Sequence, residues 1–240
     1  MQKSLLFLLC SFIPGRNLRH RVRNSFSYIS GTNNKVIVVK DGVEKVYSKN
    51  PIRGLNLHIE GANNTVKIHM PTRFNNCFLD IDSHGGNVEI KENNRFRNVQ
   101  IFMKAGRNQT ISIGKNNSMG EGNIYCDESA TCIIGNNCLF SDHINIWAID
   151  GHSIIDRETG KVINASTTPL IIGDHCWIGQ ASRITKNTQL PAHTIVGGGS
   201  VVTKKFSDEY TAIAGNPARV VKTNVDWDFS NPYFYQGKNK

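Results

Sequence analysis

A period of six residues in the apolar positions constrains the fold of this chain more than any other feature of its sequence. From residue 172 to residue 202 every sixth position is apolar: Ile172, Ile178, Ile184, Leu190, Val196 and Val202. Amphipathic helices repeat at about 3.6 residues and strands at about 2, so neither produces this spacing. A short strand followed by a turn produces it when the unit is stacked repeatedly. The period therefore predicts an all-β fold, a left-handed parallel β-helix built from hexapeptide repeats.

A second column of small residues supports the same frame. Four positions beyond the apolar residues lie Cys176, Ser182, Thr188, Thr194 and Ser200, and Cys138 takes the same place after Ile134. A narrow triangular interior admits only small side chains there, so we expect Cys138 and Cys176 to be packing residues rather than ligands or nucleophiles. The six cysteines show no CxxC spacing, which predicts free thiols in a reducing compartment.

The repeat divides the chain into four predicted parts. Residues 111–210 form the hexapeptide core, with an inserted loop at 147–170, and residues 211–240 form a C-terminal tail. Turn-then-strand patterns such as Gly-Ala-Asn-Asn-Thr-Val at 61–66 indicate that residues 31–110 are earlier, less regular coils of the same solenoid. A separate small β domain is the alternative for this stretch. Residues 1–30 form an apolar and basic N-terminal arm.

The N-terminal arm combines an apolar run at 4–13 with four arginines between Arg16 and Arg23. The run is too short to span a bilayer, which takes about 20 apolar residues. It predicts a short helix that either makes peripheral membrane contact through residues 4–23 or packs on the body or on a neighbouring subunit. An export signal is a third reading. The expected location is the cytoplasm, at the inner face of the membrane if the arm binds lipid.

The formal net charge of +9 raises the question of a nucleic-acid partner. Much of this charge is local, in the arm and near the end of the repeats, and no zinc-finger spacing, RNA-recognition signature or basic helix accompanies it. We therefore expect no nucleic-acid binding. A phosphate-bearing cofactor or an acidic polymer fits this charge better.

The hexapeptide frame breaks after Ile146 and resumes at Ile172. Gly135 and Gly173 take equivalent places 38 residues apart, whereas a coil of three hexapeptides takes about 18, so about 20 residues must leave the solenoid as a loop. Long loops inside regular solenoids are usually functional. This loop carries His152, and histidine can remove a proton from a hydroxyl near neutral pH. Asp150 or Asp156 is the candidate to orient the ring.

Another histidine, His143, lies within the regular frame and competes with His152 for a place in a groove between coils. A carbonic-anhydrase-like metal site would need three well-placed histidines, and the sequence offers His143, His152, His175 and His193. We expect no metal site, because that reading leaves the Trp-Ile-Gly motif and the Asn-Pro-Ala-Arg tail without a role.

Three segments near the C-terminus follow one another in a characteristic order: TPLIIGDHCWIGQASRITKNTQL, TIVGGGSVVTKKF and AIAGNPARVV. Together with DGHSIID at 150–156, they resemble the hexapeptide-repeat acyltransferase superfamily, in its branch of sugar and polysaccharide O-acetyltransferases. The resemblance covers roughly residues 111–224. Two departures are a triple glycine at 197–199 in place of Gly-Ala-Gly, and Lys-Phe-Ser at 205–207 in place of an acidic-apolar-proline turn.

The resemblance implies roles for individual residues. It makes His152 the catalytic general base and puts the Trp177 ring beside the acetyl group or the acceptor. With Trp177, the acceptor-binding candidates are His143, Asn145 and Asp150. The implied coenzyme site follows the pantetheine arm, adenine end and phosphates of acetyl-CoA along Gly179, Gln180, Ala181, Gly198, Ser200, Thr203, Lys204, Arg219 and Lys222.

The activity that the resemblance implies is acetyl-CoA-dependent O-acetylation of a bacterial cell-surface sugar or polysaccharide, such as a capsule, O-antigen or exopolysaccharide. It also implies a homotrimer, in which the loop of one subunit reaches the groove of the next. A strongly positive assembly would suit an anionic acceptor. The alternatives are N-acetylation of an amino sugar or other small acceptor, a non-catalytic β-helix scaffold, and a carbonic-anhydrase-like protein.

Overall fold

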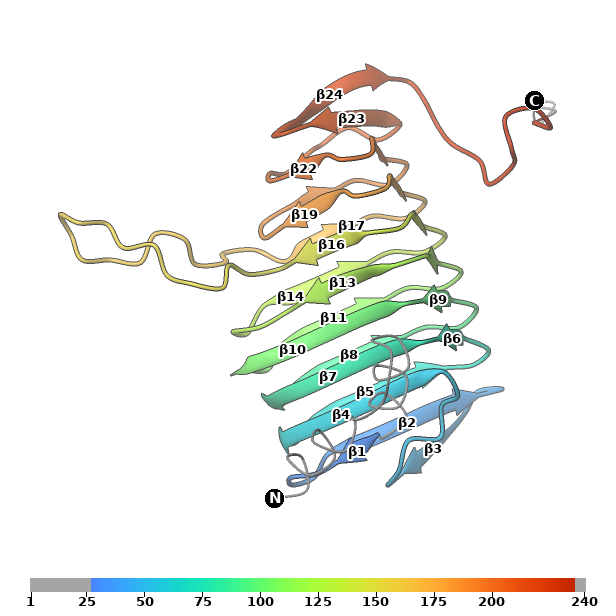
Figure 1. The fold of residues 1–240 in the computed structure, drawn as a ribbon, viewed down its shortest axis with the longest axis vertical. Coiled ribbons are helices and arrows are strands. Elements are labelled where there is room, and N and C mark those ends of the chain that lie inside the picture. The colour runs from blue at the N-terminus through green and yellow to red at the C-terminus, as the bar shows by residue number, and fades with distance from the viewer. Residues whose placement is uncertain (1–26, 236–240) are drawn as a thin grey trace, which may run out of the picture.

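The computed structural model describes residues 27–235, and in this range the chain forms a three-sided β-solenoid without a helix (Figure 1). Three eight-stranded sheets, here named A, B and C, form its sides, and successive coils contribute one strand to each. Pairing between coils is parallel, while β2 with β3 at one end and β23 with β24 at the other pair antiparallel. The predicted all-β, left-handed hexapeptide β-helix is confirmed. The predicted arm helix and Cys10 lie outside the described residues.

The strands follow one another around the three sheets in a fixed order. Sheet A contains β1 (Tyr28–Ile29), β4 (Leu55–Ala62), β7 (Cys77–His84), β10 (Val99–Arg107), β13 (Gly122–Tyr125), β16 (Ile144–Trp147), β19 (Arg183–Thr185) and β22 (Val201–Val202). Sheet B contains β2 (Lys35–Lys40), β3 (Val43–Tyr47), β5 (Thr65–His69), β8 (Asn87–Ile90), β11 (Thr110–Ile113), β14 (Thr131–Ile134), β17 (Leu170–Ile172) and β20 (Gln189–Leu190). Sheet C contains β6 (Arg73–Asn75), β9 (Arg95–Arg97), β12 (Ser118–Met119), β15 (Leu139–Phe140), β18 (Trp177–Ile178), β21 (Ile195–Val196), β23 (Thr211–Gly215) and β24 (Ala218–Thr223).

Both predicted columns point into the solenoid. The apolar column from Ile172 to Val202 is at most 2% exposed, and Cys138, Cys176, Ser182, Thr188, Thr194 and Ser200 are 0% exposed. Each fully buried aliphatic side chain contributes about 1.5–3 kcal/mol of burial free energy, so the stacked columns provide the main stabilisation of the coils. Burial also explains the cysteines. It raises the pKa of the Cys126 thiol to about 12, which keeps this group protonated and inert.

The coils before the loop are longer than hexapeptide coils. Leu55 pairs with Cys77, and Gly122 pairs with Ile144, so one coil takes 22 residues, whereas Arg183 and Val201 are 18 apart. The strands of sheet A shorten accordingly, from nine residues in β10 to two in β22. The same three sheets continue through both kinds of coil, so residues 31–110 share one solenoid with the repeats that follow.

Buried asparagines fill the corner between sheets B and C in these longer coils. The Asn117 side chain donates to the carbonyls of Gly114 and Gly135 and accepts a 2.7 Å hydrogen bond from the Cys138 amide. The Asn94 side chain accepts likewise from the Asn117 amide, at 2.7 Å. These amides satisfy backbone groups that the corner would otherwise leave unpaired in the interior. In the shorter coils Cys176 and Thr194 occupy the same inner position without an amide.

Candidate active site

The residues around His152 form the base of a long excursion that leaves the solenoid between β16 and β17, at the corner of sheets A and B (Figure 1). Residues 148–169 make this connection, and the ribbon extends away from the coils. Asn164 closes its base: its amide donates to the Asp150 carboxylate and the His152 carbonyl, both at 2.8 Å, and accepts from the Ile154 amide at 2.7 Å. We call residues 150–154 together with Asn164 the loop neck.

A single ion pair ties the loop neck to the solenoid. Lys186, in the turn after β19, bonds to the Asp150 carboxylate and to the Asn164 carbonyl. The hydrogen bond from Lys186, joined by the one from Asn164, lowers the pKa of Asp150. The Asp150 carboxylate therefore anchors the neck. Within residues 27–235 the His152 ring has no hydrogen-bond partner and is exposed to solvent.

The second carboxylate expected near the histidine, Asp156, has a different role within this chain. It accepts hydrogen bonds from the Thr159 hydroxyl and amide, both at 2.7 Å, and from the Glu158 amide at 3.1 Å. These bonds close the turn at the tip of the excursion, and the one from the Thr159 hydroxyl contributes most to lowering the Asp156 pKa. Neither Asp150 nor Asp156 bonds to the His152 ring inside one chain.

The acceptor candidates other than Asp150 lie at the corner between sheets C and A. The Trp177 side chain of β18 is 37% exposed, and its indole nitrogen lies 3.4 Å from the Ser141 hydroxyl. His143, two residues after Ser141, lies in the same corner, and its Nδ1 atom is 3.0 Å from the Glu121 carboxylate. Asn145 extends along β16 and contacts the His143 carbonyl at 3.4 Å. His143, Asn145 and Glu121 line one groove, with Asn98, Gln100, Gly122 and Asn123.

The coenzyme candidates divide between this corner and the C-terminal end. Gly179, Gln180 and Ala181 follow β18, and Gly198 follows β21, one coil further on. Ser200 is 0% exposed and its hydroxyl donates to the Gly197 carbonyl at 2.6 Å, so within one chain this predicted coenzyme residue faces the interior instead of a ligand.

The cationic candidates gather where the solenoid ends. Thr203 and Lys204 follow β22, and Arg219 and Lys222 belong to β24; all four side chains are exposed. Of these four residues Lys204 lines a shallow pocket, together with Lys205, Phe206 and Val220 among others. The flexible cations Lys204, Arg219 and Lys222, with the neighbouring Lys205, suit a phosphate-bearing ligand.

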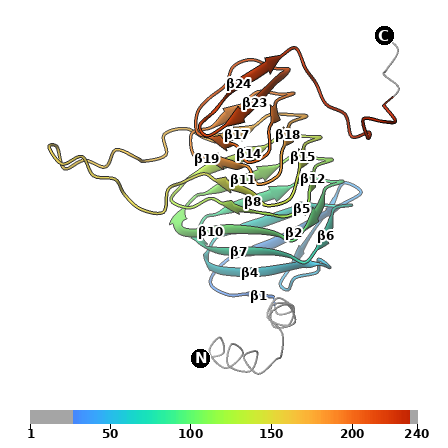
Figure 2. The same cartoon turned by 45° about the horizontal axis from the view of Figure 1, so that its top comes forward.

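Within one chain the His152 loop and the Trp177 corner do not meet. The loop leaves at the A–B corner, whereas Trp177 and His143 lie at the C–A corner, at the opposite ends of sheet A. The four residues of β16 separate these corners, which corresponds to roughly 13 Å at 3.3 Å per residue. Figure 2 shows the excursion pointing away from β12, β15 and β18, and Figure 1 shows it on the side of the solenoid opposite to β6 and β9 of the same sheet.

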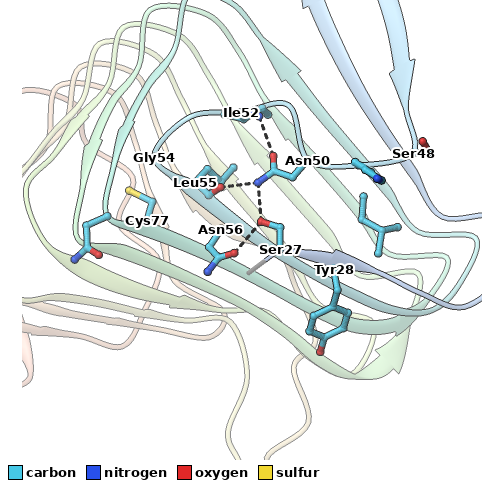
Figure 3. A pocket seen from close by; sticks show the side chains of 12 residues that line it. Ser27, Tyr28, Ser48, Asn50, Ile52, Gly54, Leu55, Asn56 and Cys77 are labelled. Carbon is cyan, nitrogen blue, oxygen red and sulfur yellow. Dashed lines mark hydrogen bonds between the residues drawn. The ribbon is translucent and has the colours of Figure 1, made fainter. Parts of the chain in front are cut away.

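A further pocket lies at the N-terminal end of the solenoid (Figure 3). It is next to β6, which lies four strands away from the Trp177 strand β18 in sheet C. Its wall is a polar network in which Asn50 donates to the Ser27 hydroxyl at 2.8 Å and Ser27 donates to Asn56 at 2.8 Å. Asn50 also donates to the Leu55 carbonyl, at 2.7 Å. None of the predicted site residues lines this pocket, and its hydrogen bonds hold the first coil together.

The chain was compared with known proteins, and its sequence relatives include O-acetyltransferases. No protein-family model matches it. Over 174 residues it is 30% identical to the polysialic acid O-acetyltransferase of Neisseria meningitidis, an alignment that covers 71% of this chain and 78% of the relative. The chain belongs to the hexapeptide-repeat acyltransferases, in the sugar and polysaccharide O-acetyltransferase branch.

Two other relatives support this membership. The polysialic acid O-acetyltransferase of Escherichia coli O1:K1 is 29% identical over 140 residues, which cover 58% of this chain and 44% of the relative, so the match spans less than half of that protein. The galactoside O-acetyltransferase of Escherichia coli K12 is 28% identical, over 61% of this chain and 74% of the relative. A solved polysialic-acid-specific acetyltransferase superposes with a TM-score of 0.56 at 24% identity, covering 86% of this chain and 83% of that one, and shows the shared fold.

Sequence reasoning missed the residues that hold the site in place. Asn164 and Lys186 hold the loop neck of this acyltransferase. Asn164 falls in no motif, and Lys186 lies in the segment 168–190 without a role that the resemblance assigns to it. A signal for Asn164 existed, because an amide side chain close to the return of a long loop commonly bonds to backbone groups. Lys186 occupies an ordinary turn position in the repeat, and only the folded chain brings it to Asp150.

Proposed function

We propose that this protein transfers the acetyl group of acetyl-CoA to a hydroxyl of an anionic bacterial cell-surface polysaccharide, with His152 as general base. The observation that carries the proposal is the match over 78% of the meningococcal polysialic acid O-acetyltransferase. The loop that carries His152 and the Trp177 corner both fall in the part of the chain that resembles this family.

His152 performs the proton transfer in this proposal. Its exposed imidazole takes the proton of the acceptor hydroxyl as that oxygen attacks the acetyl carbonyl, and returns a proton to the departing thiolate sulfur. Backbone N–H groups of the groove stabilise the negative charge on the carbonyl oxygen. The loop neck matters because the Asn164 bond to the His152 carbonyl fixes the backbone from which the imidazole extends.

The residues at the C–A corner and the C-terminal end fit acetyl-CoA, which supplies an activated acetyl thioester. Gln180 and Gly198 are both exposed, and Gly198 leaves the backbone open because a Cβ there would lie 3.2 Å from the Gln180 carbonyl oxygen. The cationic groups of Lys204, Arg219 and Lys222 match the coenzyme's phosphates. This donor places the reaction in the cytoplasm.

The separation of the His152 loop from the Trp177 corner supports a homotrimer. A threefold arrangement lets the excursion of one subunit reach the C–A corner of the next, and each of the three sites then takes residues from two chains. The net charge of +9 triples in such an assembly, which favours encounter with an anionic polymer.

The acceptor class is tested by incubating the full chain with labelled acetyl-CoA and four acceptors: a sialic acid polymer, a uronic acid polymer, a neutral glycan and a free amino sugar. We expect label in an anionic polymer, released by hydroxylamine as an ester and located by NMR. Hydroxylamine-stable label in the amino sugar would identify an amide and favour N-acetylation. His152→Ala should abolish transfer while acetyl-CoA binding persists; undiminished turnover would refute the general-base role.

The shared site is tested by co-expressing two inactive chains, His152→Ala and Trp177→Ala. If each site joins the loop of one subunit to the corner of the next, one site in four is intact in randomly mixed assemblies, so about a quarter of the wild-type activity returns. Because neither chain alone provides both groups, a loop that served its own corner would give no recovery, and this result would refute the shared site.

A further inference from the structure

The corner between sheets B and C carries a column of residues with left-handed backbone. Asn93, Asn116 and Asn137 have φ values of 62°, 61° and 58°, and His175 and His193 continue the column at 52° and 57°. Asparagine adopts this conformation more readily than most residues, and histidine is also enriched there. His175 and His193 thus carry an imidazole where the earlier coils carry an asparagine amide. The stacking of successive coils holds the centroids of the two imidazole rings 4.9 Å apart.

The C-terminal tail brings a carboxylate to these two rings. Asp226 Oδ2 lies 3.1 Å from His193 Nδ1, and Asp226 Oδ1 lies 3.5 Å from His175 Nε2. The three ligand atoms lie within 4.8 Å of one another. The main-chain oxygen of Trp227 lies 3.1 Å from the same His175 nitrogen and adds a fourth oxygen or nitrogen donor to the cluster.

Aromatic contacts fix the orientation of both imidazoles. His175 stacks on Trp227 with ring centroids 4.6 Å apart, and His193 stacks on Tyr210 at 4.3 Å. The Trp227 indole donates to the His175 carbonyl at 2.8 Å, which locks the tail against this coil. The rings are therefore oriented before any ion binds. Residues around a metal site usually orient its ligands in this way.

We propose that His175, His193 and Asp226 form a binding site for a divalent transition metal ion of the zinc class, which fastens the C-terminal tail to the solenoid. Imidazole nitrogen and carboxylate oxygen are the donors that Zn²⁺ takes at about 2.0–2.2 Å. In a tetrahedral site such ligands lie about 3.3 Å from each other, close to the observed separations of 3.1 and 3.5 Å. The Trp227 carbonyl or a water completes the coordination.

The surroundings favour an ion at this place over a simple hydrogen-bonded cluster. Two imidazoles face a single carboxylate, and the Trp227 peptide oxygen lies beside the His175 nitrogen. The His175 and His193 side chains keep 26% and 28% of their surface exposed, and Asp226 keeps 43%. Solvent can thus deliver an ion, and the opposite face of each ring is covered by Trp227 or Tyr210. The site is independent of the acetyl-transfer proposal, since none of its three ligands is placed in that reaction.

A bound ion would also support the Trp177 corner. The Trp227 ring, adjacent in sequence to Asp226, lies 6.2 Å from the Trp177 ring. Trp227 is 8% exposed and packs between His175 and Phe229. An ion bound to Asp226 therefore holds the buried indole of Trp227 in place beside Trp177, a residue of the candidate acceptor site.

The test uses the untagged full chain, because a histidine tag binds zinc itself. After dialysis against a chelator, Zn²⁺ is titrated by calorimetry and bound zinc is counted by mass spectrometry. We expect one ion per chain, and at least a tenfold loss of affinity in His193→Asn and in Asp226→Asn. Asparagine suits the left-handed corner, as at Asn137, so His193→Asn should fold. His84→Asn, an exposed histidine at the end of β7, is the matched control and should bind as the wild type does.

A second readout places the ion beside Trp227. Co²⁺ should bind with visible absorption typical of a low-coordinate site and quench part of the fluorescence from the three tryptophans of the chain. Trp227→Phe should reduce this quenching while Co²⁺ absorption persists, because Trp177, whose ring lies 6.2 Å from that of Trp227, accounts for the remainder. The site would be refuted if the wild-type chain took up no stoichiometric Zn²⁺. It would also be refuted if the Asp226→Asn variant bound Zn²⁺ as tightly as the wild type. Quenching unchanged in Trp227→Phe would place the ion elsewhere and also refute it.

Discussion

Replacing Asn164 with alanine tests whether the loop neck positions His152. The asparagine side chain makes three hydrogen bonds, to the Asp150 carboxylate, to the His152 carbonyl and from the Ile154 amide. The alanine variant keeps the coils intact, because residue 164 lies outside every strand. We therefore expect the loop, and not the solenoid, to change.

The size of the effect follows from these bonds. Each hydrogen bond contributes a net of about 0.5–1.5 kcal/mol, and solvent competes at this exposed position, so the three together order the neck by about 2 kcal/mol. A difference of about 1.4 kcal/mol is tenfold in a population or a rate, which limits the expected loss of kcat to roughly 30-fold. The melting temperature should stay within a few degrees of the wild type, because no core contact is lost.

The assay measures kcat and KM for the acetyl acceptor alongside thermal unfolding. Asp156→Ala is the matched control, since it also removes three hydrogen bonds but at the tip of the same excursion. We expect the neck variant to lose much more kcat than the tip variant at equal stability. Equal kcat values for Asn164→Ala and the wild type, or a larger loss in Asp156→Ala, would refute the positioning argument.

Two further expectations concern the interior. Asn117→Ala leaves the buried Gly135 carbonyl and Cys138 amide without their side-chain partners, which should lower the unfolding free energy by about 2–5 kcal/mol in a urea titration. The control Asn123→Ala, whose half-buried amide makes one 3.3 Å bond, should cost less than about 1 kcal/mol. Equal losses in the two variants would contradict the stabilising role of the buried corner asparagines. Because burial raises the Cys126 pKa to about 12, native Cys126 at pH 8 should react with iodoacetamide about 10³-fold more slowly than a thiol of pKa about 8.5. Mass spectrometry of the labelled peptide measures this rate, and labelling as fast as in urea would contradict it.

The sequence determines the interior of the solenoid better than its corners. The two columns that predicted the fold consist of buried residues, from Ile172 to Val202 and from Cys138 to Ser200, whose size and polarity the triangular interior restricts directly. The 22-residue coils were not predicted, because their corner asparagines resemble ordinary turn residues. Only the fold shows that Asn94 and Asn117 bond between coils as well as within their own turns.

A pattern that was present in the sequence would have identified the histidine corner. Asn116 and Asn137 each directly precede a residue of the inner column, Asn117 and Cys138, and His175 precedes Cys176 in the same way. Position alone thus places His175 and His193 on one corner. Asp226 could not be placed, because the tail has no repeat and its path depends on the stacking of Trp227 against His175.

The position of the His152 loop depends on where it leaves sheet A, whose strands become shorter along the solenoid. Its strands shorten from nine residues to four at β16, and the excursion leaves at the end of this strand that is remote from His143 and Asn145. A chain that folded its loop back over sheet A would have to reverse direction at the neck, which Asn164 and Lys186 hold in its outward course. The same bonds that order His152 therefore keep it away from its own Trp177 corner. In the homotrimer that we propose, a neighbouring copy completes this site, and the loop neck then serves the shared arrangement as well as the proton transfer.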